Sequence, residues 1–151
     1  MWGAALAEGK AKRDPALGDL EVYAGPALAI GDDVEALYGF VKPSLALYIG
    51  GMGAKGKNFY HNLATAYGFG KEADAIQELY LSGKKAEATE AVPDELVKNI
   101  SLIGPKSFVA ERVAAFKEAG VTTLNVAPLA APLAADAAGR IKHVEALREL
   151  L

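Results

Sequence analysis

The sequence predicts an α/β fold in which parallel strands are covered by helices. Its 151 residues are about one domain's worth of chain, and 52% of them are hydrophobic, which indicates a substantial buried core. An apolar run rich in β-forming residues, 20–30, leads into a helical pattern. From Ser101 onward the pattern alternates strand, helix, strand and helix, a rhythm typical of a parallel sheet.

The first elements in chain order are a helix and a strand. Residues 2–12 are compatible with a helix, and the proline and glycine in residues 15–18 end that pattern. Residues 20–30 (LEVYAGPALAI) are apolar and begin with β-formers, which predicts a buried strand. Together with the helix that follows, this strand predicts the first half of a βα unit.

A long helix is predicted next, over residues 33–50. Apolar side chains recur there at helical spacing, and Asp32 or Asp33 can cap the first turn. Pro43 lies inside the pattern and should kink or divide the helix, because proline removes a backbone hydrogen bond and clashes with the preceding turn.

Residues 51–100 are expected to form a helical insertion within a single domain that covers residues 1–151. A glycine-rich turn opens it, and short helical patterns follow that are separated by glycine, serine or proline. The predicted helices cover residues 58–67, 71–81 and 84–91, and one more begins at Pro93.

The last third of the chain predicts two more strands. Its elements are a strand over 101–103, an amphipathic helix ended by Gly120, a strand over 121–126, a loop over 127–135 and a closing helix whose apolar side carries Ile141, Val144, Leu147 and Leu150. About three parallel strands in so apolar a chain leave a sheet edge open, and an open edge is a pairing site. The architecture therefore looks incomplete.

Composition excludes several functional classes. A formal net charge of −3 and a pI near 5.4 argue against a nucleic-acid surface. The chain has no cysteine, which removes disulfides and thiolate chemistry and suits a reducing compartment. No apolar run approaches the roughly 18 residues of a membrane span, and the first residues do not resemble a signal peptide. We expect a cytoplasmic protein that binds neither nucleic acid nor membrane.

The glycine- and lysine-rich turn IGGMGAKGKNFY is the strongest candidate site. Glycine allows a ligand to approach the backbone closely, and lysines before a helix start suit an anionic group. The residues that we expect to contact a cofactor are Gly51, Gly53, Lys55, Gly56, Lys57 and Asn58, with His61 at the opening of the next helix. The alternative is a glycine-rich connector whose lysines are merely solvated, and the sequence leaves both interpretations open.

Two nucleotide-binding motifs match this turn only superficially. Gly51 to Gly56 spells G-x-G-x-x-G, but a dinucleotide fingerprint requires a strand before the glycines, and a helix is predicted there. Gly51 to Asn58 resembles a P-loop, but asparagine stands where a magnesium-binding serine or threonine is required.

Other candidate chemistry is weaker. The two histidines, His61 and His143, lie 82 positions apart without clustered carboxylates, so no metal site is predicted, and His143 is expected on a solvated helix face. No serine has a nucleophile-elbow motif. Phe59, Tyr60 and Tyr67 are expected in the core rather than as a set that stacks on a flavin.

The run from residue 20 to residue 30, the turn ALYIGGMGAKGKNFY and the stretch SLIGPKSFVAERVAAFKEAGVTTLNV together resemble the C-terminal part of the bacterial luciferase-like superfamily. They resemble most closely its branch of coenzyme F420 (deazaflavin)-dependent oxidoreductases. The resemblance implies a partial TIM barrel that carries the sixth, seventh and eighth strands and lacks the first five. Much of the coenzyme pocket would lie in the absent half, so no catalytic residue is assigned.

Two functions follow as hypotheses. In the first, the chain is part of an oxidoreductase or monooxygenase that uses F420, with FMN as the alternative coenzyme, and passes hydride between the reduced coenzyme and a small organic substrate. This fragment alone would be inactive. In the second, the chain is a non-catalytic barrel remnant that acts as an assembly module. Its partner would then be another copy of itself or a separate N-terminal barrel half.

Overall fold

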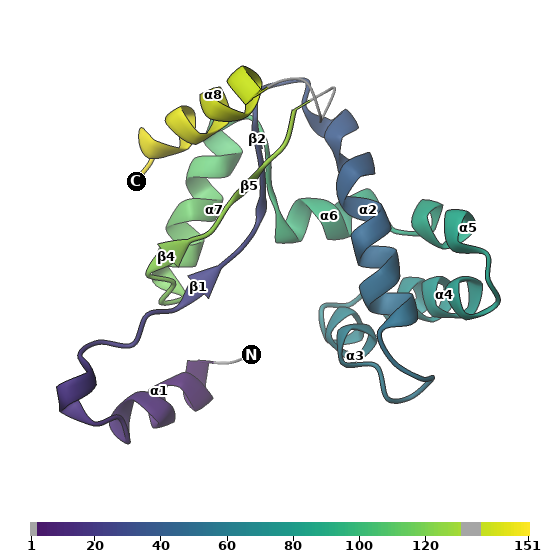
Figure 1. Cartoon of the computed structure of the whole chain (residues 1–151), viewed down its shortest axis with the longest axis horizontal. Helices are drawn as coiled ribbons and strands as arrows, with labels where there is room; N and C mark the ends of the chain where they lie inside the picture. Colours follow the sequence, from purple (N-terminus) through teal and green to yellow (C-terminus); the bar gives the residue numbers. More distant parts are fainter. Residues whose placement is uncertain (1–2, 131–136) are drawn as a thin grey trace.

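The computed structural model describes residues 3–130 and 137–151. Parallel strands with helices on both sides make up the chain, which confirms the predicted α/β class (Figure 1). The helices are α1 (Gly3–Ala11), α2 (Tyr38–Ala46), α3 (Phe59–Ala66), α4 (Gly70–Leu81), α5 (Lys85–Glu90), α6 (Asp94–Ile100), α7 (Lys106–Glu118) and α8 (Ala137–Arg148). The strands are β1 (Tyr23–Ala24), β2 (Ala27–Ile30), β3 (Leu102–Gly104), β4 (Thr123–Leu124) and β5 (Ala127–Pro128).

The two long strands predicted from the sequence differ from the observed ones: the first is divided, and the second is shorter than expected. β1 and β2 share the run 20–30, and Pro26 separates them because proline has no backbone N–H for a ladder. β4 lies within the run 121–126, and β5 follows at Ala127–Pro128. The predicted loop over 127–135 is therefore wrong at its first two residues, and its part from residue 131 onward lies outside the described residues.

The strands form two small parallel sheets. β1 pairs with β4, and β2 lies between β3 and β5. In a closed barrel each strand lies beside its neighbours in chain order, which would place β3 between β2 and β5. The observed order instead puts β2 in the centre, with β3 on one edge and β5 on the other.

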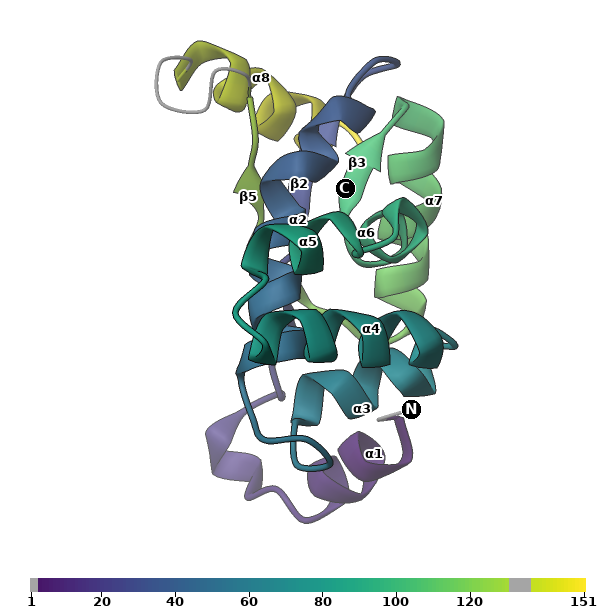
Figure 2. The ribbon, with the colours of Figure 1, turned by 90° about the vertical axis from the view of Figure 1, so that its right-hand side faces the viewer.

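The two faces of the central sheet carry different cores. Ala29 of β2 and Ile103 of β3 are buried against α2 through α6, whereas Leu28 and Leu102 are buried against α7 and α8. Figure 2 shows α2, α4, α5 and α6 gathered on one side of β2. In contrast, α1 has no buried residue and lies apart from the sheet (Figure 1).

The helix predicted over 33–50 begins later than expected and changes its hydrogen bonding. A 3-10 turn at Glu35–Leu37 precedes α2, and its cap position is Val34, whose side chain accepts no hydrogen bond; the prediction of an aspartate cap was wrong. α2 runs through Pro43 to Ala46, so proline does not divide it there. A π-helical turn, Leu47–Gly51, completes the segment.

The remaining predicted helices are present. α3 through α7 begin and end within a few residues of the predicted positions. The closing helix is also present as α8, but its apolar face is narrower than the sequence suggested. Leu147 is buried on it, whereas Ile141 is 56% exposed.

Candidate functional site

The glycine turn connects the end of the π-helical turn to α3, and three of its glycines are required by packing. A Cβ atom on Gly50 would lie 2.5 Å from the Cβ of Tyr80, and one on Gly51 would overlap the Tyr80 ring. A Cβ on Gly53 would lie 2.9 Å from the Cα of Asn58. Gly56 has a positive φ of 79° with open space around it. The glycines thus let the turn fold closely against its own helices.

Asn58 is the structural centre of this turn. Its side chain is fully buried, and its amide nitrogen donates to the carbonyl oxygens of Tyr48 and Ile49 at 3.0 and 2.8 Å. Its amide oxygen accepts from the backbone N–H groups of Tyr60 and His61, which caps α3. Both donors and both acceptor positions of the amide are therefore used inside the protein, and the helix N-terminus is already capped.

The two lysines of the turn face solvent. Lys55 and Lys57 are exposed, and within the described part of the chain neither ammonium group has an ion-pair partner. His61 points instead toward α4, where its Nε2 lies 2.9 Å from a carboxylate oxygen of Asp74. Of the predicted contact residues, the lysines are therefore the side chains best placed to meet a ligand from outside.

Exposed aromatic side chains flank these lysines in the sequence. The ring of Tyr60 packs against Tyr48, with centroids 4.7 Å apart, and against Phe59 at 5.3 Å. Phe59 is 55% exposed and Tyr60 38%, so the expectation that they lie in the core was wrong. The same holds for Tyr67, which is 49% exposed.

We call this region the aromatic–lysine surface. Its members combine exposed rings, an exposed thioether and two cationic groups within one turn and its flanking helices. It consists of Tyr48, Met52, Lys55, Lys57, Phe59 and Tyr60. Exposed rings and exposed ammonium groups within one short segment suit a ligand that is both aromatic and anionic.

The carboxyl end of the sheet is a second region of interest, because ligands of parallel α/β sheets bind there. His143 of α8 lies at this end: its Nδ1 accepts a hydrogen bond from the backbone N–H of Ile30, at 3.0 Å. It is half-buried rather than solvated, which corrects the prediction from sequence. As the acceptor is Nδ1, the neutral ring carries its proton on Nε2.

Tyr38 begins α2 just beyond this end of the sheet. Its side chain is buried, and burial raises the pKa of its phenol, with smaller contributions from Glu35, Asp94 and Glu95. The phenol therefore remains a neutral hydrogen-bonding group well into the alkaline range.

The structure does not bring these two regions together. α2 and its π-helical extension run from the carboxyl end of β2 down to the glycine turn, in both views of the chain (Figures 1 and 2). Fourteen residues, from Tyr38 through Gly51, span roughly 20 Å of helix. One compact ligand cannot contact both the aromatic–lysine surface and the strand ends.

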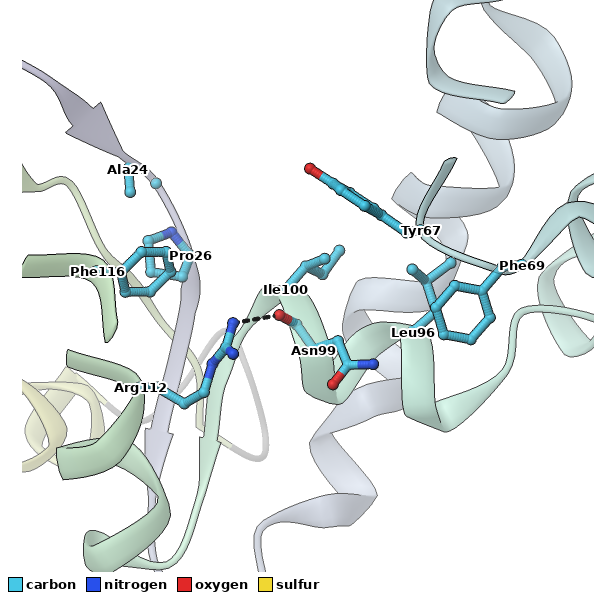
Figure 3. A pocket seen from close by; sticks show the side chains of 10 residues that line it. Ala24, Pro26, Tyr67, Phe69, Leu96, Asn99, Ile100, Arg112 and Phe116 are labelled. Atoms are coloured by element: carbon cyan, nitrogen blue, oxygen red, sulfur yellow. Dashed lines mark hydrogen bonds between the residues drawn. The ribbon is translucent and has the colours of Figure 1, made fainter. Parts of the chain in front are cut away.

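A cavity of about 540 Å³ lies at the opposite end of the sheet, where the chain enters β2 and β3 (Figure 3). Its lining includes Tyr67, Phe69, Asn99 and Phe116, and Arg112 donates to the backbone carbonyl of Asn99. The guanidinium lies 5.6 Å from the Phe116 ring centroid. The cavity is mostly apolar and lies away from the carboxyl ends of the strands.

Two further kinds of feature are absent among the described residues. No group of three or more histidine, aspartate or glutamate side chains is arranged to hold a metal ion. No helix in the described ranges is long and apolar enough to cross a membrane.

Comparison with known proteins identifies the family. Residues 1–123 match the family described as luciferase-like monooxygenase. A stretch of 108 residues is 39% identical to a Mycobacterium tuberculosis protein whose name proposes a coenzyme F420-dependent oxidoreductase activity. That stretch is 72% of this chain and 31% of the relative, so the chain spans about a third of that protein's length. No solved structure matches the chain. The chain therefore belongs to the luciferase-like monooxygenase family.

Proposed function

We propose that the chain is the C-terminal part of a luciferase-like oxidoreductase barrel that uses coenzyme F420. Family membership supports the reaction class, and the name of the M. tuberculosis relative supports the coenzyme. FMN is the alternative coenzyme. When bound, the coenzyme supplies the redox chemistry by passing hydride to or from a small organic substrate. The chain's own residues bind and orient it.

The observation that carries the coenzyme proposal is the aromatic–lysine surface. Lys55 and Lys57 are exposed cations whose charges no described residue neutralises. The exposed rings of Tyr48, Phe59 and Tyr60 flank them in the sequence and pack on one another. This donor set fits the acidic tail of a deazaflavin coenzyme and the carbon skeleton next to it.

The length of α2 sets a limit on what this surface does. Because the strand ends lie roughly 20 Å away, the turn is proposed to hold the anionic tail and not the reactive ring. The ring would lie at the carboxyl ends of the strands, where residues from the rest of the barrel complete the pocket. The fragment alone should therefore bind coenzyme weakly and show no turnover.

Fluorescence titration of F420 tests this proposal. The chain is mixed with the part of the M. tuberculosis relative that it does not match, and Lys55→Ala and Lys57→Ala are compared with the unaltered chain. Each substitution should weaken binding about tenfold, and the loss should shrink as salt rises. Lys117→Ala, an exposed lysine of α7, is the matched control and should have no effect. Equal affinity for all four proteins would exclude this anion site.

An assembly function is the second candidate. The order β3-β2-β5 and the exposed helix α1 favour it, because both leave surfaces that a barrel would cover. In that case the mixture would form a stable complex without binding F420 or FMN.

A further inference from the structure

β5 lies on an edge of the central sheet that its place in the chain does not predict. β5 follows β3 and α7 in the chain, yet it pairs with β2 and not with β3. β2 therefore has a neighbour on each side, β3 on one edge and β5 on the other. In a barrel, each strand pairs with its neighbours in chain order. If the chain is part of such a barrel, β5 occupies the edge of β2 on which a different strand would pair.

Along the edge of the β1–β2 run that faces β4 and β5, some positions have no backbone N–H that reaches a backbone acceptor. Backbone N–H groups from the β4–β5 segment reach the carbonyls of Val22, Ala24, Pro26 and Leu28. At the two ends of the same edge, N–H groups use side chains as acceptors: that of Val22 donates to the Thr122 hydroxyl and that of Ile30 to His143. In between, Pro26 has no N–H at all. At Val22 and Ile30, side-chain atoms thus accept the hydrogen bonds that backbone carbonyls of a longer neighbouring strand would accept.

α1 indicates which strand belongs there. It is a nine-residue helix without a buried residue, although helices of parallel α/β units normally cover a sheet. Consecutive parallel strands are usually neighbours joined by a right-handed helical crossover. A strand that comes before α1 would therefore pair with β2, and β3 already occupies the other edge.

We propose that the edge of β2 now held by β5 is the docking site for a parallel strand carried by a separate N-terminal barrel half. This inference rests on the proposed function, because it assumes the sequential barrel. On docking, β5 leaves β2 and moves to the outer edge of β3, which has no strand neighbour among the described residues. The segment that moves lies largely beyond residue 123, where the match to the family ends.

The size of the relative supports a partner of this kind. The chain spans 31% of the M. tuberculosis protein, so most of a barrel of that family lies outside the matched stretch. A second copy of this chain would bring the same strands again rather than the missing ones. An N-terminal half also supplies the sheet face that α1 lacks.

A disulfide lock tests the proposal. Ala27 and Ala127 are register partners of β2 and β5, and the chain contains no cysteine of its own. Neighbouring strands lie about 4.8 Å apart, within the range that a disulfide bridges. The variant Ala27→Cys with Ala127→Cys therefore fixes β5 on β2 when oxidised and releases it when reduced. The control, Ala29→Cys with Ile103→Cys, locks β2 to β3, a pair that both arrangements keep.

The probe is the part of the M. tuberculosis relative that this chain does not match, produced as a separate polypeptide. Its affinity for each variant is measured by calorimetry in oxidising and reducing buffer. We expect oxidation to weaken binding at least tenfold for the β2–β5 lock and to leave the β2–β3 lock unchanged. Reduction should restore binding of the first variant.

Two kinds of result would overturn the inference. If the oxidised β2–β5 lock binds as well as its reduced form, the partner does not use this edge. If the unaltered chain does not bind the probe, or light scattering shows only self-association, the edge does not accept an N-terminal half. Lock-dependent binding without F420 affinity would refute the proposed coenzyme function but leave the docking site standing.

Discussion

The two faces of β2 differ in how completely they are packed. On the face toward α2 through α6, Ala29 and Ile103 belong to a core of thirteen buried residues among those described, and most of the other eleven lie in these helices. On the other face, the cluster around Leu28 and Leu102 has five, and half-buried side chains of α7, α8 and β4 surround it. The face packed by α2 through α6 is thus nearly complete, and we call it the finished face; the face packed by α7 and α8 keeps many half-buried side chains, and we call it the unfinished face.

The difference shows that the more completely packed face of the sheet is the one covered by helices that are close together in the sequence. Helices α2 through α6 pack mainly on their neighbours in the chain, so their core depends little on distant segments. The opposite face depends on strands that come from distant positions. A chain that represents about a third of its relative's length can satisfy the first requirement more easily than the second.

A core truncation on each face is expected to have the largest effect and to test the comparison directly. Ile76 is fully buried in the core between the sheet and α2–α6, and Ile76→Ala should cost about 2–5 kcal/mol of unfolding free energy. Leu147→Ala on the other face should cost less than about 2 kcal/mol, because half-buried neighbours can close the gap. Urea unfolding followed by circular dichroism measures both. Equal losses would show that the two faces are equally well packed.

Asn58 is expected to give the next largest effect, within the finished face. Asn58→Ala removes the cap of α3 and leaves the carbonyls of Tyr48 and Ile49 without a donor, for a loss of about 2–3 kcal/mol. Asn58→Asp keeps the cap acceptor but sets a carboxylate against both carbonyls, so it should also destabilise the fold. Thermal melts of the two variants check this. A stable Asn58→Asp protein would contradict the donor role.

A substitution at His143 tests the unfinished face and is expected to change stability less than the variants above. His143→Ala leaves the N–H of Ile30 without its acceptor and should cost about 1 kcal/mol. The loss should be local, so we expect faster hydrogen exchange at Ile30 with little change in the global melt. Lys142→Ala, the exposed neighbour on α8, is the control and should leave exchange unchanged. Unchanged exchange in the histidine variant would mean that α8 does not hold this edge.

The smallest expected effect concerns the exposed ion pair between Lys106 of α7 and Glu149, which lie 2.6 Å apart. The hydrogen bond from Lys106, and then its charge, lower the pKa of Glu149. Stability from this pair is present above the pKa of Glu149 in the unfolded chain and is lost as pH falls through the lowered folded value. In Lys106→Met, NMR titration should find the Glu149 pKa returned to its ordinary range. A pKa that stays low would assign the shift to another group.

Elements that depend on local sequence could be predicted well. Asn58 before an apolar pattern and the glycines after helices are signals that act within a few residues, and α3 and α4 lie where they indicate. Pro26 also carried a local signal, since a proline inside a run demotes a continuous strand, and it could have been used to divide residues 20–30.

Features that depend on distant partners could not be read from the pattern. Strand order is one: the rhythm of strands and helices indicates parallel pairing but does not determine that β5 lies beside β2. His143 is another, since its hydrogen bond to Ile30 joins residues 113 positions apart. The exposure of Phe59 and Tyr60 was missed for a related reason, because apolar side chains predict burial only where something covers them.

The contact between Tyr80 and the bare backbone of Gly50 and Gly51 has a consequence for protein engineering. A library that varies either glycine alone will recover almost nothing, since every side chain meets the tyrosine. A library that also reduces Tyr80 to a small residue opens position 51, whose nearest atoms all belong to the tyrosine ring. Position 50 stays closed, because there the Cβ of Tyr80 itself and the backbone carbonyl of Ile76 stand in the way. Positions 51 and 80 therefore form one design variable, and in natural sequences we expect these two to change together.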